Sequence, residues 1–116
     1  MTTSTMDKWI EAQQLEPKVV AVDSHFTGDG WAYEYVFESE EYVLIQHYGA
    51  KPHLTIEDHW TDEVLAYTEE SFDFDHVQCA EALLKTAKGS KYVRKSTVEK
   101  IISKLMFGDL KLESPY

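Results

Sequence analysis

Three histidines and an aspartate lie close together in the middle of the chain and are of the types that bind metal ions. His47, His53 and His59, with Asp58 beside the last, supply the imidazole nitrogens and the carboxylate that zinc binds. Their spacing is neither a helical i, i+4 pair nor a Cys/His knuckle. A small metal-binding enzyme domain built on these four residues is therefore the weakest of the functional hypotheses.

Cys79 is the only cysteine and would be a nucleophile if a histidine activated it. Its neighbours are small and apolar, which favours a partly buried helical position where cysteine behaves as a small hydrophobic residue. A single cysteine excludes an internal disulfide and suits a reducing cytosol. Adjacent carboxylates such as Glu57 and Asp58 could do acid–base work, but adjacency means little in so acidic a region. We expect no catalytic residue and no cofactor.

The charge of the chain is unevenly divided. The formal net charge is −10, and residues 19–84 carry fifteen carboxylates against the single base Lys51. Residues 85–116 carry eight lysines and arginines against three carboxylates. An acidic body repels nucleic acid and attracts basic surfaces. We therefore expect no direct contact with nucleic acid, and a basic nucleic-acid-binding protein as the partner.

A dense set of carboxylates can imitate the phosphates of duplex DNA, which present one charge per about 1.7 Å of axis. Carboxylates on loops and strand edges are the best placed to do so. A solvated acidic surface without a partner is the plainer alternative. The predicted protein-binding residues are Asp29, Glu34, Glu38, Glu40, Glu41, Glu57, Asp58, Asp62, Glu63, Glu69, Glu70, Asp73 and Asp75.

The elements that position these carboxylates are organised around the stretch from Trp31 to Tyr48. Every odd position of residues 31–37 is aromatic, a period of two that is typical of a half-buried strand. A second β-rich run follows at residues 42–48, and the acidic connection between the two suits a hairpin loop. We expect this aromatic row to lie in the core, beneath amphipathic helices.

Further strands are predicted at residues 18–26 and 53–57, which gives four successive strands and an antiparallel meander. Residues 64–68 form either a fifth strand or a short helix capped by Thr61, and their Val, Tyr and Thr favour the strand. A short helix is expected at the N-terminus, with Ser4 as its cap and Pro17 beyond its end.

Two helices are predicted after the strands. Asp73 or Asp75 caps the first, which ends at Gly89. The residues Ser96-Thr-Val-Glu99 form a capping box for the second, and Gly108 ends it. The predicted fold class is α+β: one domain over residues 1–116, with an N-terminal helix, a four- or five-stranded antiparallel meander and two C-terminal helices packed on one face.

Three short runs resemble a known family. They are Phe26-Thr-Gly28-Asp29-Gly30-Trp31, Tyr35-Val-Phe37-Glu38 and Val43-Leu44-Ile45-Gln46. Over residues 26–46 this pattern resembles the sheet region of small acidic phage anti-CRISPR proteins that act on type I-F systems as mimics of double-stranded DNA. The chain differs in a longer loop at residues 39–42 and in a basic C-terminal helix.

The resemblance and the charge together predict a non-enzymatic, phage-encoded inhibitor of host defence. Its acidic face would occupy the DNA-binding groove of a CRISPR effector subunit in the cytoplasm of the host cell. No run of residues is apolar enough for a membrane span, and residues 1–7 lack the pattern of a signal peptide. The alternative within the same class is an immunity protein that neutralises a basic nuclease toxin.

Overall fold

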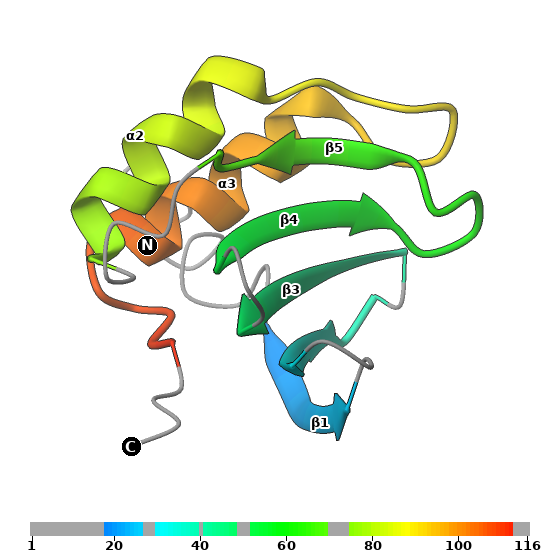
Figure 1. The fold of residues 1–116 in the computed structure, drawn as a ribbon. Coiled ribbons are helices and arrows are strands. Elements are labelled where there is room, and N and C mark those ends of the chain that lie inside the picture. The colour runs from blue at the N-terminus through cyan, green and yellow to red at the C-terminus, as the bar shows by residue number, and fades with distance from the viewer. Residues whose placement is uncertain (1–17, 27–29, 40, 49–51, 70–74, 113–116) are drawn as a thin grey trace, which may run out of the picture.

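A computed structural model describes residues 18–26, 30–39, 41–48, 52–69 and 75–112 (Figure 1). The predicted N-terminal helix lies outside these residues. The chain forms five strands followed by two helices, and the class is α+β. The elements are β1 (Val19–Phe26), β2 (Trp31–Phe37), β3 (Tyr42–Tyr48), β4 (His53–Asp58), β5 (Val64–Tyr67), α2 (His76–Thr86) and α3 (Lys95–Met106).

The strands form one antiparallel meander, as the sequence predicts. Their order in the sheet is β1-β2-β3-β4-β5, so each strand pairs with its neighbour in the chain. The fifth strand is confirmed, and the helical alternative for this segment is wrong. A tight turn explains the outcome: Asp58 N–H donates to the carbonyl of Glu63, and Asp62 adopts a φ of 61°, which brings β5 back alongside β4.

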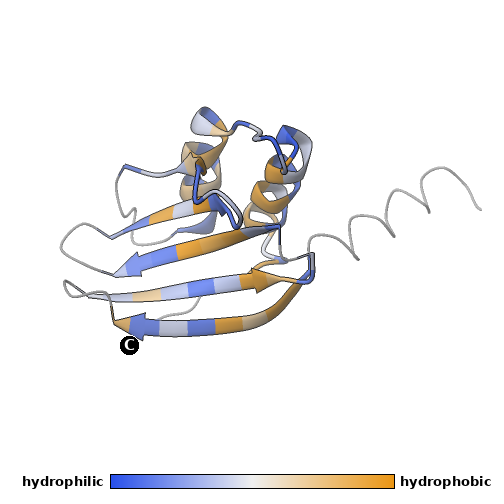
Figure 2. Cartoon of the chain, turned by 90° about the vertical axis from the view of Figure 1, so that its right-hand side faces the viewer, coloured by the Kyte–Doolittle hydropathy of each residue, from blue (hydrophilic) through white to orange (hydrophobic). Residues whose placement is uncertain are grey.

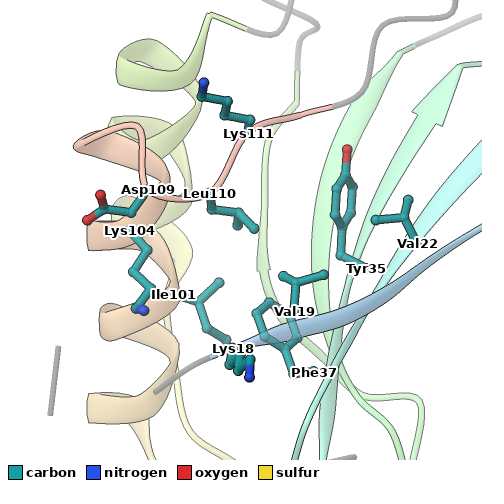
Figure 3. A pocket seen from close by; sticks show the side chains of 10 residues that line it. All are labelled: Lys18, Val19, Val22, Tyr35, Phe37, Ile101, Lys104, Asp109, Leu110 and Lys111. Atoms are coloured by element: carbon teal, nitrogen blue, oxygen red, sulfur yellow. The ribbon is translucent and has the colours of Figure 1, made fainter. Parts of the chain in front are cut away.

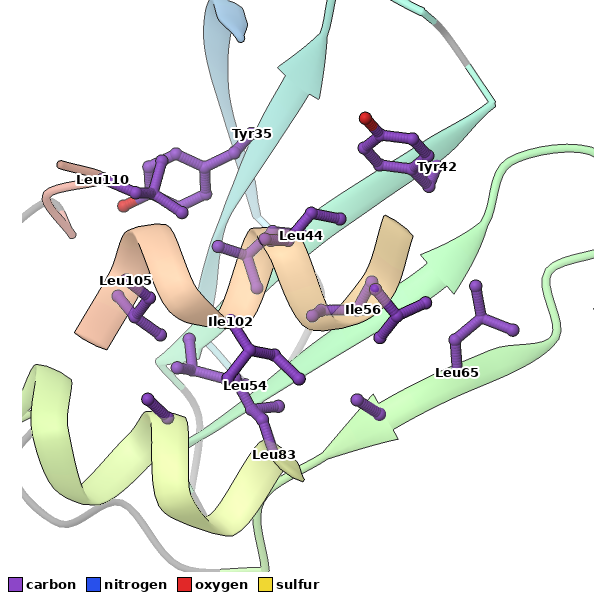
Figure 4. Close-up of a cluster of buried hydrophobic side chains, with 14 of the residues drawn as sticks. Tyr35, Tyr42, Leu44, Leu54, Ile56, Leu65, Leu83, Ile102, Leu105 and Leu110 are labelled. Atoms are coloured by element: carbon purple, nitrogen blue, oxygen red, sulfur yellow. The ribbon is translucent and has the colours of Figure 1, made fainter. Parts of the chain in front are cut away.

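The core lies on one side of the sheet. Tyr35, Leu44, Ile56 and Ala66 follow one another across four strands and are all buried. Hydrophobic and hydrophilic residues follow one another along the strands (Figure 2), as expected for a sheet with one face in the core. Apolar residues of both helices join the same cluster (Figure 4). The helix residues buried in this cluster are Cys79, Ala80, Leu83, Val98, Ile101, Ile102 and Leu105.

The aromatic row of β2 is only partly in the core. Tyr35 and Phe37 are buried, as predicted, and the Tyr35 hydroxyl donates to Gln46 Oε1 at 2.7 Å. Trp31 is 52% exposed and packs edge-to-face on Phe26, with 5.7 Å between the ring centroids. The expectation that Trp31 is a core residue is therefore wrong, because it lies at the opposite end of β2 from Phe37, at the turn that joins β1.

The helix ends agree with the sequence at two of four positions. Asp75 caps α2 by accepting a hydrogen bond from the Gln78 N–H at 3.0 Å, and Gly108 follows α3. α2 ends at Thr86, before Gly89, and the hydroxyl of this last helical residue bonds to the backbone of Tyr67 on β5.

The predicted capping box of α3 is wrong. The helix begins at Lys95, and its cap residue Arg94 makes no side-chain cap hydrogen bond. A turn directly before the helix explains the earlier start, since Ser90 N–H donates to the carbonyl of Val93. The Arg94 carbonyl then accepts from the N–H groups of Thr97 and Val98, so Ser96 already lies inside the first turn.

Two glycines allow a matched test of this packing. Gly108 has a φ of +79° with open space around its missing Cβ, so Gly108→Ala costs only the conformational strain, about 1 kcal/mol. A Cβ on Gly89 would lie 2.8 Å from the backbone nitrogen of Lys95 and 3.0 Å from the carbonyl oxygen of Val93. We expect Gly89→Ala to lower the unfolding free energy more than Gly108→Ala in urea titrations. Equal losses would contradict the close approach of Gly89 to Val93 and Lys95.

Candidate protein-binding face

The sheet has a second face, on the side away from the core, and its residues follow from the strand register. Successive side chains along a strand point to opposite faces. Because Tyr35 faces the core, Glu34 faces the other way, as do the residues aligned with it. We call this the outer sheet face. Its residues are Ala21, Asp23, His25, Ala32, Glu34, Val36, Val43, Ile45, His47, His53, Thr55, Glu57, Val64 and Tyr67.

The outer sheet face carries negative charge and no formal positive charge. Its carboxylates are Asp23, which is exposed, and Glu34 and Glu57, which are half-buried. None of the five described strands contains a lysine or an arginine. The helices supply basic residues instead: Lys85, Lys95, Lys100 and Lys104. The charge asymmetry along the sequence therefore becomes an asymmetry between the sheet and the helices.

Two of these carboxylates oppose each other directly. Asp23 on β1 lies across from Glu34 on β2 in the antiparallel register. Like charges at directly opposite positions destabilise a sheet by roughly 0.2–1 kcal/mol. A lysine or arginine of a binding partner placed between them would remove this repulsion. Sequence reasoning left Asp23 out of the site, because only the register shows which residue faces Glu34.

The third carboxylate, Glu57, is held by a hydrogen-bond chain across two strands. The Thr55 hydroxyl donates to Glu57 Oε2 at 2.8 Å, and His47 Nε2 lies 3.2 Å from the same hydroxyl. Since the Thr55 hydroxyl donates its proton to Glu57, the contact with His47 is a hydrogen bond in the tautomer that carries the imidazole proton on Nε2. In a nucleophilic site the histidine would accept the hydroxyl proton. These hydrogen bonds therefore orient Glu57 and do not activate the Thr55 hydroxyl.

A second acidic group lies at one end of the sheet, where the β2–β3 and β4–β5 connections meet. The His59 N–H donates to the carbonyl of Glu41 and joins the two connections. We call this the acidic sheet end, and its exposed carboxylates are Glu38, Glu41, Asp62 and Glu63. Lys88 forms an ion pair with Glu63 at 2.9 Å, which is worth at most about 1 kcal/mol at an exposed position. It is the one ion pair among the described residues.

Asp58 does not belong to the exposed acidic surface. Its exposure is 0%, and its carboxylate accepts hydrogen bonds from the Ser90 hydroxyl at 2.5 Å and from the N–H groups of Trp60 and Thr61. Burial by itself raises the pKa of Asp58, but these hydrogen bonds outweigh it and hold the pKa below its ordinary value. Asp58 thus joins the β4–β5 turn to the loop between α2 and α3.

The other predicted contact residues do not gather with these groups. Asp75 is engaged as the cap of α2, and Glu69 follows β5, at the end of that strand away from the acidic sheet end. The remaining four, Asp29, Glu40, Glu70 and Asp73, lie outside the described residues. The described part of the predicted site therefore consists of the outer sheet face and the acidic sheet end.

The four residues of the metal hypothesis do not converge. His47 and His53 stack on the outer sheet face, with their ring centroids 4.1 Å apart. Asp58 points into the core at the other end of β4, and His59 packs against Trp60 in the turn beyond it. Among the described residues, no group of three or more histidine, cysteine or acidic side chains could hold a metal ion.

Cys79 is buried in the core, as the sequence suggests. Burial, helped by the negative charge of Asp75, raises the pKa of its thiol to about 11. The thiol is therefore protonated at neutral pH, and its burial keeps dissolved reagents away from it.

A cavity of about 330 Å³ opens between β1, β2 and α3 (Figure 3). Its apolar lining includes Val19, Tyr35 and Ile101, and lysine side chains from Lys18 and Lys104 also line it. It lies on the core side of the sheet and shares no residue with the outer sheet face.

No family model, no curated protein and no solved structure matches the chain. Within the residues that the structure describes, no helix is long and apolar enough to cross a membrane. The outer sheet face and the acidic sheet end are therefore the features from which a function can be inferred.

Proposed function

We propose that this protein is a non-enzymatic inhibitor that binds a basic nucleic-acid-binding protein through an acidic, DNA-mimicking surface. The observation that carries the proposal is the separation of charge between the sheet and the helices. The outer sheet face presents Asp23, Glu34 and Glu57 on strands without a single lysine or arginine. A face of this kind complements a groove lined by lysine and arginine and repels nucleic acid itself.

The rigidity of the face supports the same role. Neighbouring strands lie about 5 Å apart, so the sheet fixes the spacing of its carboxylates, as a duplex fixes the spacing of its phosphates. The hydrogen bond from Thr55 to Glu57 restricts one of these carboxylates further. A preorganised charged surface loses less entropy on binding than flexible side chains would lose.

The partner that we propose is a CRISPR effector subunit of the type I-F kind, with the protein encoded by a phage and acting in the host cytoplasm. The resemblance over residues 26–46 suggests this target. It covers β2 and most of β3, which contribute Glu34, Val43 and Ile45 to the outer sheet face. The same segment contributes Glu38 and Glu41 to the acidic sheet end.

Binding to the purified type I-F effector complex tests the proposal. We expect the protein and target duplex DNA to compete for the effector, because both would occupy the same basic groove. We also expect the affinity to fall about tenfold or more between roughly 50 and 500 mM salt, since screening weakens charge complementarity. The mimic mechanism would be contradicted if the effector bound this protein and duplex DNA at the same time. It would also be contradicted if the affinity for the effector did not change with salt.

A further inference from the structure

The two edge strands of the sheet, β5 and β1, differ in how far other parts of the chain cover them. The β5 edge is covered by the end of α2 and the residues after it. Lys88 N–H donates to the carbonyl of Leu65 at 2.9 Å, and Tyr67 N–H donates to the Thr86 hydroxyl at 2.8 Å. The same hydroxyl lies 3.1 Å from the Tyr67 carbonyl oxygen. The outward carbonyl of Leu65 and both outward backbone groups of Tyr67 are therefore occupied, which protects an edge against pairing with another chain.

Among the described residues, none covers the β1 edge in a comparable way. β1 is the longest strand, and in the described part of the chain its backbone pairs with β2 alone. Proline and lysine, which usually protect edges, are absent from its eight residues. Apolar side chains on it are exposed, 40% for Val22 and 63% for Phe26. Phe26 also packs on the exposed Trp31 of β2.

We propose that a second copy of this chain pairs with β1, antiparallel and centred on Ser24, so that two sheets join into one of ten strands. In a two-fold antiparallel pair, residues that face each other lie on the same side of the sheet. Centring on Ser24 places Asp23 opposite His25 of the second copy, an acceptor opposite a donor. It also places Val22 opposite Phe26 of the second copy, apolar opposite apolar.

Neighbouring registers are less favourable. Centring on Asp23 would place the two Asp23 carboxylates opposite each other, where like charges repel. Centring on Val22 would place Asp23 opposite Ala21, which offers it no hydrogen bond. The regular part of β1 supports a centre near Ser24, because the β1–β2 register is unbroken from Ala21 to Phe26 and irregular before it.

The dimer would place two outer sheet faces side by side on one continuous sheet. Val22, Phe26 and Trp31 of each copy would line the seam on the core side, since they share that side with Tyr35. Asp23 and His25 would line it on the outer side. This dimer is independent of the proposed function, because the pairing involves only two copies of this chain.

A cysteine at the two-fold axis tests the register. In Ser24→Cys the two introduced thiols face each other, at a Cα separation of about 4.5–5.5 Å that a disulfide can span. In the control Ala21→Cys, also exposed on β1, the two thiols would lie about 20 Å apart. The native Cys79 is buried and does not compete. Under mild oxidation we expect Ser24→Cys to form the cross-linked dimer at least tenfold faster than Ala21→Cys. Equal rates, or no cross-link in Ser24→Cys, would overturn the proposal.

Charge exchange tests the same register without a cross-link. Sedimentation of the native chain should show a concentration-dependent species of twice the 13.4 kDa chain mass. His25→Asp places like charges opposite each other twice, so we expect dimerisation about tenfold weaker. The double variant Asp23→Lys with His25→Asp places opposite charges at the same two positions and should restore the dimer. Circular dichroism spectra serve as the control that each variant is folded. A native chain that stays monomeric, or a His25→Asp variant that dimerises as the native chain does, would contradict the pairing.

Discussion

Replacing both Glu34 and Glu57 by lysine should weaken binding to the basic partner by about 100-fold or more. Each replacement removes an attractive charge pair and adds a repulsive one, and close pairs at protein interfaces are coupled by about 1.5 kcal/mol or more. The coupling energies of two such pairs together exceed the roughly 2.7 kcal/mol that corresponds to a 100-fold change in the dissociation constant. The dissociation constant for the effector complex, measured at low salt, checks this result.

The matched control is the pair Glu81→Lys and Glu99→Lys, which changes the net charge equally. These glutamates are exposed on α2 and α3, away from the outer sheet face. We expect the control to keep most of the affinity. The same loss in both double variants would show that total charge matters and the position of the carboxylates does not.

The Glu34→Lys change in the sheet variant is not expected to destabilise the fold. Glu34→Lys turns the repulsion with Asp23 into an attraction across the β1–β2 pair. We therefore expect this single variant to be slightly more stable than the native chain, by up to about 1 kcal/mol. Thermal melts of Glu34→Lys and of the double variant separate an effect on binding from an effect on folding.

Asp58→Ala should have the largest effect on stability among the acidic residues, a loss of about 3 kcal/mol in the unfolding free energy. The change leaves the Ser90 hydroxyl and the N–H groups of Trp60 and Thr61 without their acceptor in a buried place. It also separates the β4–β5 turn from the loop between the helices. Urea titration measures the loss.

Two variants control this prediction. Asp58→Asn keeps the shape and one neutral acceptor oxygen, so we expect it to lose only part of the stability. Glu57→Ala removes the adjacent carboxylate, which is half-buried and bonded to Thr55, and should cost about 1 kcal/mol or less. If Asp58→Ala is as stable as Glu57→Ala or more stable, Asp58 does not hold the β4–β5 turn to the loop between α2 and α3.

The pKa of Asp58 predicts how the effect depends on pH. Folding lowers this pKa below its ordinary value of 3.8, so the unfolded chain binds the proton more tightly than the folded chain. The carboxylate therefore contributes its full stability above pH 3.8 and loses it as the pH falls through the lower folded value. We expect the gap in stability between the native chain and Asp58→Asn to be constant near neutral pH and to narrow below about pH 4.

The sequence by itself determined most of the fold. Alternation in residues 31–37 and the β-rich runs around it predict the strands, because a half-buried strand needs a period of two. Asp75 and Gly108 are recognisable as helix ends, because a side-chain acceptor and a residue that tolerates positive φ have local roles. Such signals depend on near neighbours in the chain, and the structure confirms a cap at Asp75 and a positive φ at Gly108.

The tertiary structure alone decided which acidic residues can form a site. Glu57 and Asp58 are neighbours of the same charge, yet the pleat of β4 turns one toward the outer sheet face and the other into the core. Asp58 is stable there because Ser90, distant in the sequence, donates to it. Asp23 joins the site because the register places it across from Glu34. Whether each of these acidic residues is buried or joins the site depends on partners that only folding brings together. Residue type and spacing along the chain therefore could not predict it.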